Sequence, residues 1–544
     1  MKVRNLQLKE ALGRMTTPEI QKELDNIPAP DTTNVCGHEA YAIEDELRLL
    51  SILNTLKLEP QFYKDTTEQL VEIQDIISRV ASKDPYFVAQ CIIYSRCMRD
   101  GMRTVNHLAA ALLTPYLRGQ EWAKRFYSGW NKKQNIGGCI YRLDDMAEIK
   151  NVWAELNPRS TGKHKNKSLP NSMKKGFASV LENADSYQIL KYKKAAIDIA
   201  NLTHPNISKC KGKVEVDGET MVTLDALMKG KSVSADTWEA NNSEAGQLVA
   251  QAKREGKITE EQAKEMLTKA KADNFDALLH EGKLNILAAI RNIRNMLKVC
   301  SDINALCELL SNREKIKQGK IMPYQIDMAY EIVKSECYSQ QVLDALLKGY
   351  EASVPNLAEI CTGSNLVIMD VSGSMTTSML DAKTGRRLSS CADKAALIAA
   401  TLAKATNADV IQFSDSAKYI RPIAPDENIF SYSKKIRKGE FGGTNLASAF
   451  KLITNKNKHY DRIFILSDNA CNSGSQVHAY SEYVKRVNSP YIYSVDLAAY
   501  GTQPLKNTDK VFYYYGYGMS LFEDIQTQEF KAADHIAKVR SIVI

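Results

Sequence analysis

The chain has 544 residues, 44% of them hydrophobic and 25% charged, a composition typical of a globular protein with about two to four domains. No run of about 18 apolar residues occurs, and the N-terminal segment MKVRNLQLKEALGRM is charged throughout, so neither a membrane-spanning helix nor a secretory signal is expected. The eleven cysteines are scattered and form no CxxC pair, which argues against a zinc cage or a disulfide framework. The sequence therefore predicts a cytoplasmic protein with reduced thiols.

Positive charge is concentrated in one part of the chain. The net charge is +8 overall, which is a mild excess for this length. Between Lys163 and Lys213, however, eleven lysines stand against three acidic residues, so this stretch alone carries an excess as large as that of the whole chain. Such a stretch is typical of a protein that binds a polyanion.

Residues 1–360 are predicted to be helical. Apolar residues recur there at intervals of three and four, while period-two alternation is rare. The clearest helical segments are 43–56, 67–82, 86–98, 110–130 and 284–300. Successive amphipathic helices without a heptad seam indicate stacked helical pairs, an α-solenoid of the HEAT type. Residues 209–276 interrupt the pattern with a more polar composition, as either an inserted mobile flap or an exposed surface helix.

From residue 361 to 544 the pattern changes to alternating strands and helices. The predicted strands are 365–370, 408–413, 462–468, 491–496 and 510–517. A helical segment such as 389–406 lies between successive strands, and this alternation predicts a parallel sheet covered on both faces, a doubly wound α/β domain. Ligands of such sheets bind at the carboxyl ends of the strands.

Five side chains with oxygen atoms are predicted to gather at that edge. Asp370, Ser372 and Ser374 follow directly from the first predicted strand. Thr444 comes from a Gly-Gly-Thr-Asn loop, and Asp468 ends the third predicted strand. Five oxygen ligands, two of them carboxylates, suit a hard octahedral ion, so we expect Mg²⁺ or Mn²⁺. An Asp-Ser turn alone is a common structural motif, but three such segments in this order are far more specific.

This constellation resembles the metal-ion-dependent adhesion site of von Willebrand factor A domains, over about residues 361–544. The resemblance implies that Asp370, Ser372, Ser374 and Thr444 bind the ion directly or through water. It implies that Asp468 acts mainly through water, and that one coordination position stays open for a partner's carboxylate.

The order of a helical region followed by such a domain is similar to that of the Ro ribonucleoprotein autoantigen family, whose helical part is the TROVE module. The stretches that carry this likeness are LPNSMKKGFASVL (169–181), ILKYKKAAIDIANLTHP (189–205), DTWE (236–239) and LAAIRNIRNML (287–297), followed by DVSGSM and GGTN. The likeness covers nearly the whole chain. It departs from the family pattern at His204, which Pro205 follows directly, and over the segment 209–276.

The resemblance implies a noncoding-RNA-binding protein, in RNA quality control or as an adaptor to an exoribonuclease. The helical repeats would close into a ring that the A-type domain fastens. Small structured Y RNAs would bind a basic outer surface, and the 3′ ends of misfolded RNAs would enter a central cavity.

The residues agree with such a role, because lysines bind phosphate and rings stack on unpaired bases. The candidate RNA-binding residues of the outer surface are Lys174, Lys175, Lys191, Tyr192, Lys193, Lys194 and His204. The candidates for the cavity share helical faces: Arg291, Arg294 and Lys298 on one, and Arg96, Arg99 and Arg103 on another. Each arginine face would otherwise be a solvated face that pairs with acids on neighbouring helices.

Two other classes of function stay open. The chain could be a protein-interaction scaffold whose metal site grips an acidic residue of a partner. It could also be a metal-dependent hydrolase, because Mg²⁺ with two carboxylates activates water. The sequence has no HExxH, no GxSxG and no complete phosphate-binding loop, and the pair Asp144-Asp145 is typical of a helix cap or of surface acids. We therefore expect no enzymatic activity.

Overall fold

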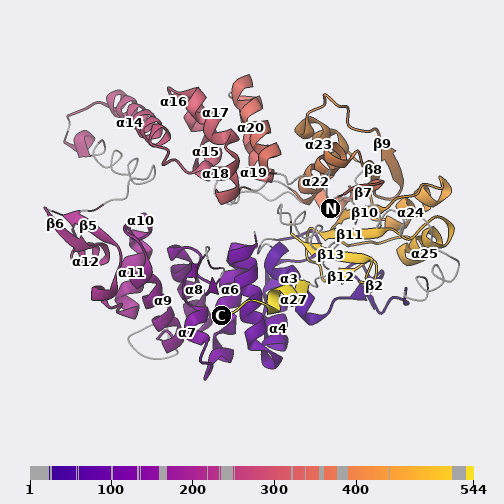
Figure 1. Ribbon diagram of the computed structural model, residues 1–544, viewed down its shortest axis with the longest axis horizontal. Coiled ribbons are helices and arrows are strands. Elements are labelled where there is room, and N and C mark those ends of the chain that lie inside the picture. Colours follow the sequence, from indigo (N-terminus) through magenta and orange to yellow (C-terminus); the bar gives the residue numbers. More distant parts are fainter. Residues whose placement is uncertain are drawn as a thin grey trace. The chain divides into compact units, whose positions relative to one another are not determined.

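The structure, a computed structural model, consists of a mostly helical part and a domain built on a parallel sheet (Figure 1). No helix of the described ranges is both long and apolar enough to cross a bilayer. The structure describes residues 24, 27–56, 58, 60–99, 102–131, 134, 136–158, 168–216, 218–231, 233, 249, 251–255, 257–319, 321, 323–336, 339–353, 361–376, 390–439, 442–516 and 535–544.

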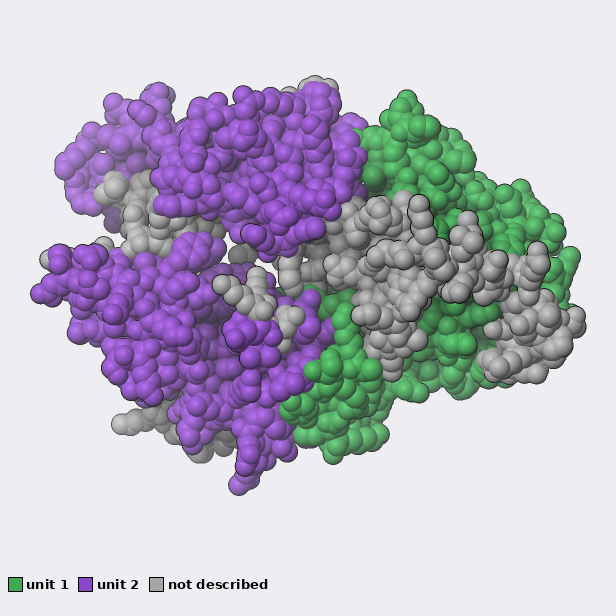
Figure 2. Space-filling view, in the orientation of Figure 1, with its two compact units in different colours: residues 1–91, 99–106, 355–541 green, residues 92–98, 107–354, 542–544 purple. Residues whose placement is uncertain are grey.

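The chain divides into two compact units (Figure 2). Unit 1 comprises residues 1–91, 99–106 and 355–541, and unit 2 comprises residues 92–98, 107–354 and 542–544. The packing thus groups N-terminal residues with the C-terminal sheet domain, which no pattern in the sequence indicated. The division into sequence domains 1–360 and 361–544 stays a prediction.

A six-stranded sheet forms the centre of unit 1. In spatial order its strands are β13 (Val511–Tyr515), β11 (Tyr491–Asp496), β10 (Arg462–Ser467), β7 (Asn365–Asp370), β8 (Asp409–Phe413) and β9 (Ala417–Ile420). All neighbours are parallel except β8 and β9. The five predicted strands and the doubly wound fold class are confirmed, and β9 is an additional edge strand. The strand order reverses between β7 and β10.

Helices cover both faces of this sheet, as the alternation of strands and helices predicted (Figure 1). Leu366 and Ile368 of β7 pack in one core with residues of α24 (Leu446–Asn455) and α25 (Gln476–Arg486). The intervening side chains point to the opposite face, where α22 (Cys391–Thr406) and α23 (Ile429–Arg437) lie. All six residues of β7 are therefore buried, which explains why its sequence is apolar without alternation.

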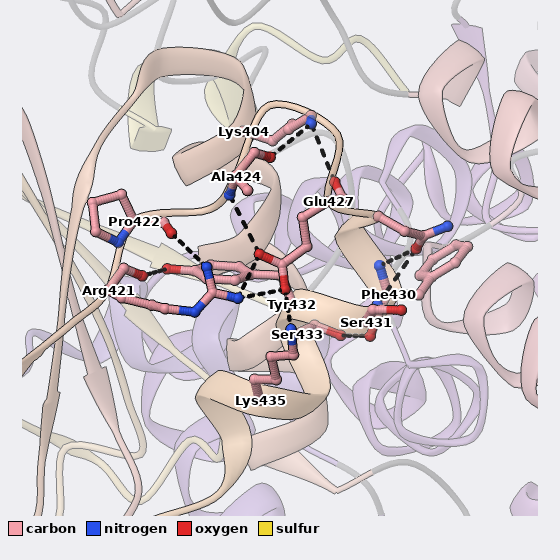
Figure 3. Close-up of polar contacts among 11 residues, drawn as sticks. Lys404, Arg421, Pro422, Ala424, Glu427, Phe430, Ser431, Tyr432, Ser433 and Lys435 are labelled. Carbon is pink, nitrogen blue, oxygen red and sulfur yellow. Dashed lines mark hydrogen bonds and ion pairs between the residues drawn. The ribbon is translucent and has the colours of Figure 1, made fainter.

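A network of ion pairs and backbone hydrogen bonds lies at the amino edge of the sheet (Figure 3). The Glu427 carboxylate accepts hydrogen bonds from Arg421 at 2.9 Å, from Lys435, and from the Ala424 backbone N–H at 3.3 Å. The ammonium group of Lys404, near the end of α22, donates to the carbonyl oxygens of Ala424 and Glu427 at 3.4 and 3.1 Å. The charges of Arg421, Glu427 and Lys435 at this edge are thus paired with one another.

The N-terminal residues contribute a second, small sheet to unit 1. Strands β1 (Thr32–Thr33) and β2 (Glu39–Ala42) form a hairpin, and β12 (Thr502–Gln503) pairs antiparallel with β2. Helices α3 (Asp45–Thr55) and α4 (Thr66–Lys83) follow this hairpin. The backbone hydrogen bonds of β2 and β12 therefore join the N-terminal hairpin to the sheet domain.

The helical prediction for the N-terminal region is confirmed. The elements from the end of unit 1 through unit 2 are α5 (Pro85–Ile93), η1 (Tyr94–Met98), α6 (Arg103–Leu113), η2 (Thr114–Leu117), α7 (Ala123–Phe126), α8 (Leu143–Leu156), α9 (Asn171–Asn183), α10 (Ser186–Lys191), α11 (Lys193–Thr203), α12 (Thr223–Met228), α14 (Glu260–His280), α15 (Ile286–Arg291), α16 (Ile293–Val299), α17 (Ile303–Ser311), α18 (Arg313–Gly319), α19 (Pro323–Glu336) and α20 (Gln340–Ser353). Two short hairpins, β3–β4 (Trp130–Asn131, Ile136–Gly137) and β5–β6 (Lys213–Val216, Glu219–Val222), interrupt the helices.

Two of the predicted helices are broken. The segment 110–130 leaves the α-helix after Leu113, at Thr114-Pro115, because proline disfavours helical backbone in the preceding residue. The segment 284–300 divides at Asn292 into α15 and α16. Of the polar segment 209–276, the described part includes the hairpin β5–β6 and α14, whose first turns are largely exposed.

Candidate metal centre and candidate nucleic-acid interface

Two buried carboxylates lie at the carboxyl ends of adjacent parallel strands. Asp370 is the last residue of β7, and Asp468 follows the last residue of β10; both side chains belong to residues at most 1% exposed. Because the strand order reverses between β7 and β10, this is the edge position at which ligands of doubly wound sheets bind.

Hydrogen bonds join the three predicted segments to one another. The Gly373 N–H donates to the carbonyl oxygen of Gly442 at 3.2 Å, which links the first segment to the second. The Thr444 N–H donates to Oδ1 of Asn472 at 2.8 Å, and the Asn472 N–H returns a bond to the Thr444 carbonyl at 3.0 Å, which links the second to the third. The structure therefore brings the segments of all five predicted metal ligands together.

The hydroxyl groups of these segments are also buried. Ser372, Ser374 and Thr444 are exposed by 1, 6 and 1% respectively. Oγ of Ser372 lies 3.2 Å from Oγ of Ser374, so the two alternate positions of the turn place their oxygens side by side.

The two carboxylates carry more negative charge than the protein around them neutralises. Oδ1 of Asp370 accepts a bond from the Ser372 N–H at 2.8 Å, and Oδ2 accepts one from the Ser467 hydroxyl at 2.6 Å. Burial and the nearby Asp468 charge nevertheless raise the pKa of Asp370 to about 7. Burial also raises the pKa of Asp468, whose buried Oδ2 has no hydrogen-bond partner. A buried, unpaired charge is costly, and a bound cation would remove that cost.

The oxygen donors fit a hard divalent cation. The described residues contain no group of three or more His, Cys, Asp or Glu side chains that could hold a metal, so a site here depends on hydroxyl oxygens beside the two carboxylates. Hydroxyl and carboxylate oxygens are the donors that Mg²⁺ and Mn²⁺ prefer.

Several positioning residues of this edge were not predicted. Asn472 holds Thr444, and Ser467 holds Asp370, as described above. Asp415 accepts a bond from the Gly443 N–H at 2.8 Å and so fixes the Gly-Gly turn. Asn469 is buried and adopts the left-handed conformation, at φ 62°, and its side-chain amide has no hydrogen-bond partner. For Asn469 and Asn472 the signal in the sequence was the cluster of polar residues that follows β10 directly.

The candidate RNA-binding lysines lie on three helices of unit 2, α9, α10 and α11. Lys175, Lys193 and Lys194 are exposed, and Lys174 and Lys191 are half-buried. None of these five forms an ion pair with an acidic residue of the described ranges. The further lysines at 163, 165 and 167 and the DTWE stretch fall outside the described residues.

Two of the three acidic residues in this part of the chain bind the backbone instead, and the third, Asp198, is exposed and pairs with none of these lysines. Oε1 of Glu182 accepts a bond from the Asn206 N–H at 2.9 Å. Oδ1 of Asp185 caps α10 through the Gln188 N–H at 2.7 Å. The five lysines, which we call the lysine patch, therefore keep their charges available for a ligand.

The two predicted stacking residues occupy helix ends. Tyr192 separates α10 from α11 and is half-buried, with the Arg142 guanidinium 5.2 Å and the Lys191 ammonium 5.9 Å from the centre of its ring. His204 ends α11 in the left-handed conformation, at φ 49° and ψ 62°, and is exposed. Its conformation is thus that of a helix cap, and its ring is accessible.

The arginine faces differ from the prediction. Arg96 lies in η1, which ends at Met98, whereas Arg103 begins α6, so Arg96, Arg99 and Arg103 share no helix. The Arg96 guanidinium pairs with the buried carboxylate of Asp145. This residue therefore pairs with an acid of a neighbouring helix, which was the alternative to RNA binding.

The second arginine face is also divided between helices. Arg291 is the last residue of α15 and is exposed, and Arg294 is half-buried in α16. Because Asn292 breaks the helix between them, the regular spacing that placed both arginines on one face with Lys298 does not hold.

Comparison with known proteins identifies the sheet domain. The family model of the Ro60 vWA domain matches residues 365–495. The crystal structure of the Ro (RSR) protein of Deinococcus radiodurans is similar over 89% of this chain and 99% of that chain, with a TM-score of 0.52 and 16% sequence identity. At this identity the likeness establishes a shared fold.

Two further comparisons give no additional information on the fold or the family. An aerotolerance-related membrane protein from Bacteroides fragilis, at 16% identity, covers 33% of this chain and 96% of that chain with a TM-score of 0.19, which supports no structural argument. No curated protein sequence matches the chain. Residues 365–495 thus match a von Willebrand A domain of the Ro60 type, in a chain that shares the fold of a Ro protein.

Proposed function

We propose that the chain binds small structured noncoding RNA, of the Y type, through the lysine patch and the adjacent Tyr192 and His204. The observation that carries this proposal is the set of five lysines on α9 to α11 without ion pairs to described acids. Exposed ammonium groups bind phosphates independently of sequence, while accessible rings stack on unpaired bases.

The finer role follows from the family resemblance. We propose that Arg291 and Arg294 contribute to binding the 3′ ends of misfolded RNAs in a central cavity. The protein would act in cytoplasmic RNA quality control, as an adaptor to an exoribonuclease and not as an enzyme. The two arginines lie on separate helices, so a shared helical face no longer supports this assignment. It rests on their positive charge alone.

We further propose that Asp370, Ser372, Ser374, Thr444 and Asp468 hold Mg²⁺ or Mn²⁺. The support is the pair of buried carboxylates and the unpartnered oxygen of Asp468. The bound ion would neutralise the two carboxylates.

The RNA-binding proposal is tested by the affinity of the full-length protein for a labelled stem-loop RNA with an internal loop. We expect the triple variant Lys191→Ala, Lys193→Ala, Lys194→Ala to bind it more weakly at moderate salt. The matched control removes three exposed lysines of unit 1, Lys418, Lys451 and Lys485, and should leave the affinity nearly unchanged. Equal affinities of wild type and patch variant would refute the proposal.

A protein-interaction scaffold is the second candidate function, and the oxygen-lined metal centre favours it. In that role the ion would bind an acidic residue of a partner protein. The absorbance ratio at 260 and 280 nm of the purified protein separates the two: retained RNA raises the ratio, whereas a scaffold elutes free of nucleic acid.

A further inference from the structure

The N-terminal hairpin of unit 1 contacts the loop that carries Asp468. Nδ2 of Asn34, which is buried, donates to the carbonyl oxygen of Cys471 at 2.5 Å. The thiol of Cys36 lies 3.7 Å from the carbonyl oxygen of Ala470. Ala470 and Cys471 follow Asp468 by two and three residues, so the hairpin lies against the predicted metal loop itself.

A second N-terminal stretch, residues 60–64, contacts the neighbouring loop after β11. Nε2 of Gln61 donates to the carbonyl oxygen of Ala498 at 2.9 Å. The Lys64 ammonium donates to the carbonyl oxygen of Tyr500 at 3.1 Å and to Glu72 of α4 at 2.7 Å. The backbone around residue 63 is therefore held from both sides.

Between these anchors, the side chain of Tyr63 reaches the metal-bearing edge. Its ring meets the Tyr500 ring edge-on, at 5.4 Å between centroids, and packs with Cys36 against a buried cluster that includes Ala470. Burial, a hydrogen bond with Cys36 and the Asp468 charge raise the pKa of Tyr63, whereas a hydrogen bond with Ser374 lowers it. Tyr63 thus packs against the loop that follows Asp468, and its hydroxyl interacts with Ser374.

We propose that the metal centre acts on a segment of its own chain and not on a partner protein. It fastens the chain's own N-terminal segment, residues 32–42 and 60–64, to the A-type domain, and Tyr63 closes the face on which a partner's carboxylate would otherwise bind. This inference rests on the proposed metal ligands. It assigns the centre to a clasp inside unit 1 and separates it from the RNA-binding surface.

The way the segment is attached supports an internal occupant over an external one. The backbone pairing of β2 with β12 and the bond from Nε2 of Gln476 to the carbonyl oxygen of Glu39, at 2.8 Å, join it to the A-type domain at several points. An external acidic group would have to displace Tyr63 against the anchors provided by Gln61 and Lys64.

The test is hydrogen exchange of the full-length protein, followed by mass spectrometry, after removal of metal and at increasing Mg²⁺. At a free concentration ten times the dissociation constant, we expect exchange in residues 32–42 and 60–64 to slow by about tenfold, because the ion binds only the docked state. The hairpin β5–β6 of unit 2 should be unaffected and serves as the internal control. Tyr63→Phe keeps the ring but removes the hydroxyl, so its slowing should be smaller, whereas Val35→Ala, an exposed position of the same segment, should match wild type.

A second measurement uses bound Mn²⁺ and acetate. In wild type, acetate should leave the water relaxation caused by Mn²⁺ unchanged, and in Tyr63→Ala it should lower that relaxation by displacing water. If the protein binds Mg²⁺ but exchange in the segment does not respond, or if acetate acts equally on both proteins, the clasp is refuted while the metal site stands. If no divalent ion binds at all, both the proposed metal site and the clasp are refuted.

Discussion

The Arg96 guanidinium donates to both oxygens of the Asp145 carboxylate, at 2.9 and 3.0 Å, inside unit 2. The same carboxylate accepts a bond from His107 at 2.9 Å and from the Tyr141 and Arg142 backbone N–H groups at 3.1 and 2.9 Å. Asp145 is fully buried, so a single charge caps α8 and joins it to η1 and α6. This ion pair explains why Arg96 is not available to a ligand.

Removing this carboxylate should destabilise unit 2 strongly. Asp145→Ala leaves the Arg96 charge without its buried partner, and we expect a loss of about 3 to 5 kcal/mol in the free energy of unfolding, measured by urea denaturation. Asp144→Ala is the matched control. Its carboxylate pairs with the 41% exposed side chain of Arg142, so its loss should stay below about 1 kcal/mol.

The same carboxylate makes stability depend on pH. Burial alone would raise the pKa of Asp145, but the hydrogen bond from His107 and the Arg96 charge outweigh it and hold the pKa well below the ordinary value of 3.8. Its contribution is therefore fully present above that value and is lost as the pH falls below it. The urea midpoint of wild type should drop more steeply from pH 5 to pH 3 than that of Asp145→Asn. Parallel slopes would contradict this assignment.

The salt dependence of RNA affinity should indicate how many phosphate contacts the lysine patch makes. Each contact removed lowers the slope of the logarithm of affinity against the logarithm of salt concentration by about 0.7 to 0.9. The triple variant of Lys191, Lys193 and Lys194 should therefore lose up to about 2 to 3 in slope, measured by anisotropy titrations at several salt concentrations. A weaker affinity with an unchanged slope would mean that the substitutions act through the fold and not through phosphate contacts.

A substitution at His204 can separate its structural role from its proposed role in RNA binding. Glycine adopts φ 49° without strain, so His204→Gly should gain up to about 1 kcal/mol in stability. If the ring stacks on RNA, the same variant should bind the stem-loop RNA more weakly even though it is more stable. Unchanged RNA affinity would assign His204 to the helix cap alone.

The sheet domain could be predicted because its signals are local. β7 and β11 are largely apolar runs that each end in an aspartate, and their predicted bounds agree with the structure. β9 has only four residues, none of them buried, and gave no apolar pattern. The order of Asp370, Thr444 and Asp468 was informative because parallel strands bring successive carboxyl ends to one edge.

Relations between distant parts of the chain could not be predicted. Asp145 lies 49 residues from Arg96, and its polar surroundings in the sequence are typical of a helix cap or a surface acid; only the cap is observed. Asn34 lies 437 residues from the carbonyl group that it binds. No spacing or periodicity indicates such a contact, so the position of Tyr63 beside the loop that follows Asp468 is known only from the tertiary structure.

The proposed metal centre predicts opposite effects of one substitution with and without the ion. In the metal-free protein, Asp468→Asn removes one of two buried carboxylates that repel each other, so its thermal midpoint should rise above that of wild type. With Mg²⁺ at 100 times the dissociation constant, wild type should gain about 2.7 kcal/mol and the variant nothing, so their order reverses. Asp426→Asn, an exposed acid at the amino edge of the sheet, should behave as wild type in both conditions. A variant that still gains stability from Mg²⁺ would mean that the ion binds elsewhere, because the site proposed here has only Asp370 as a second carboxylate to hold it.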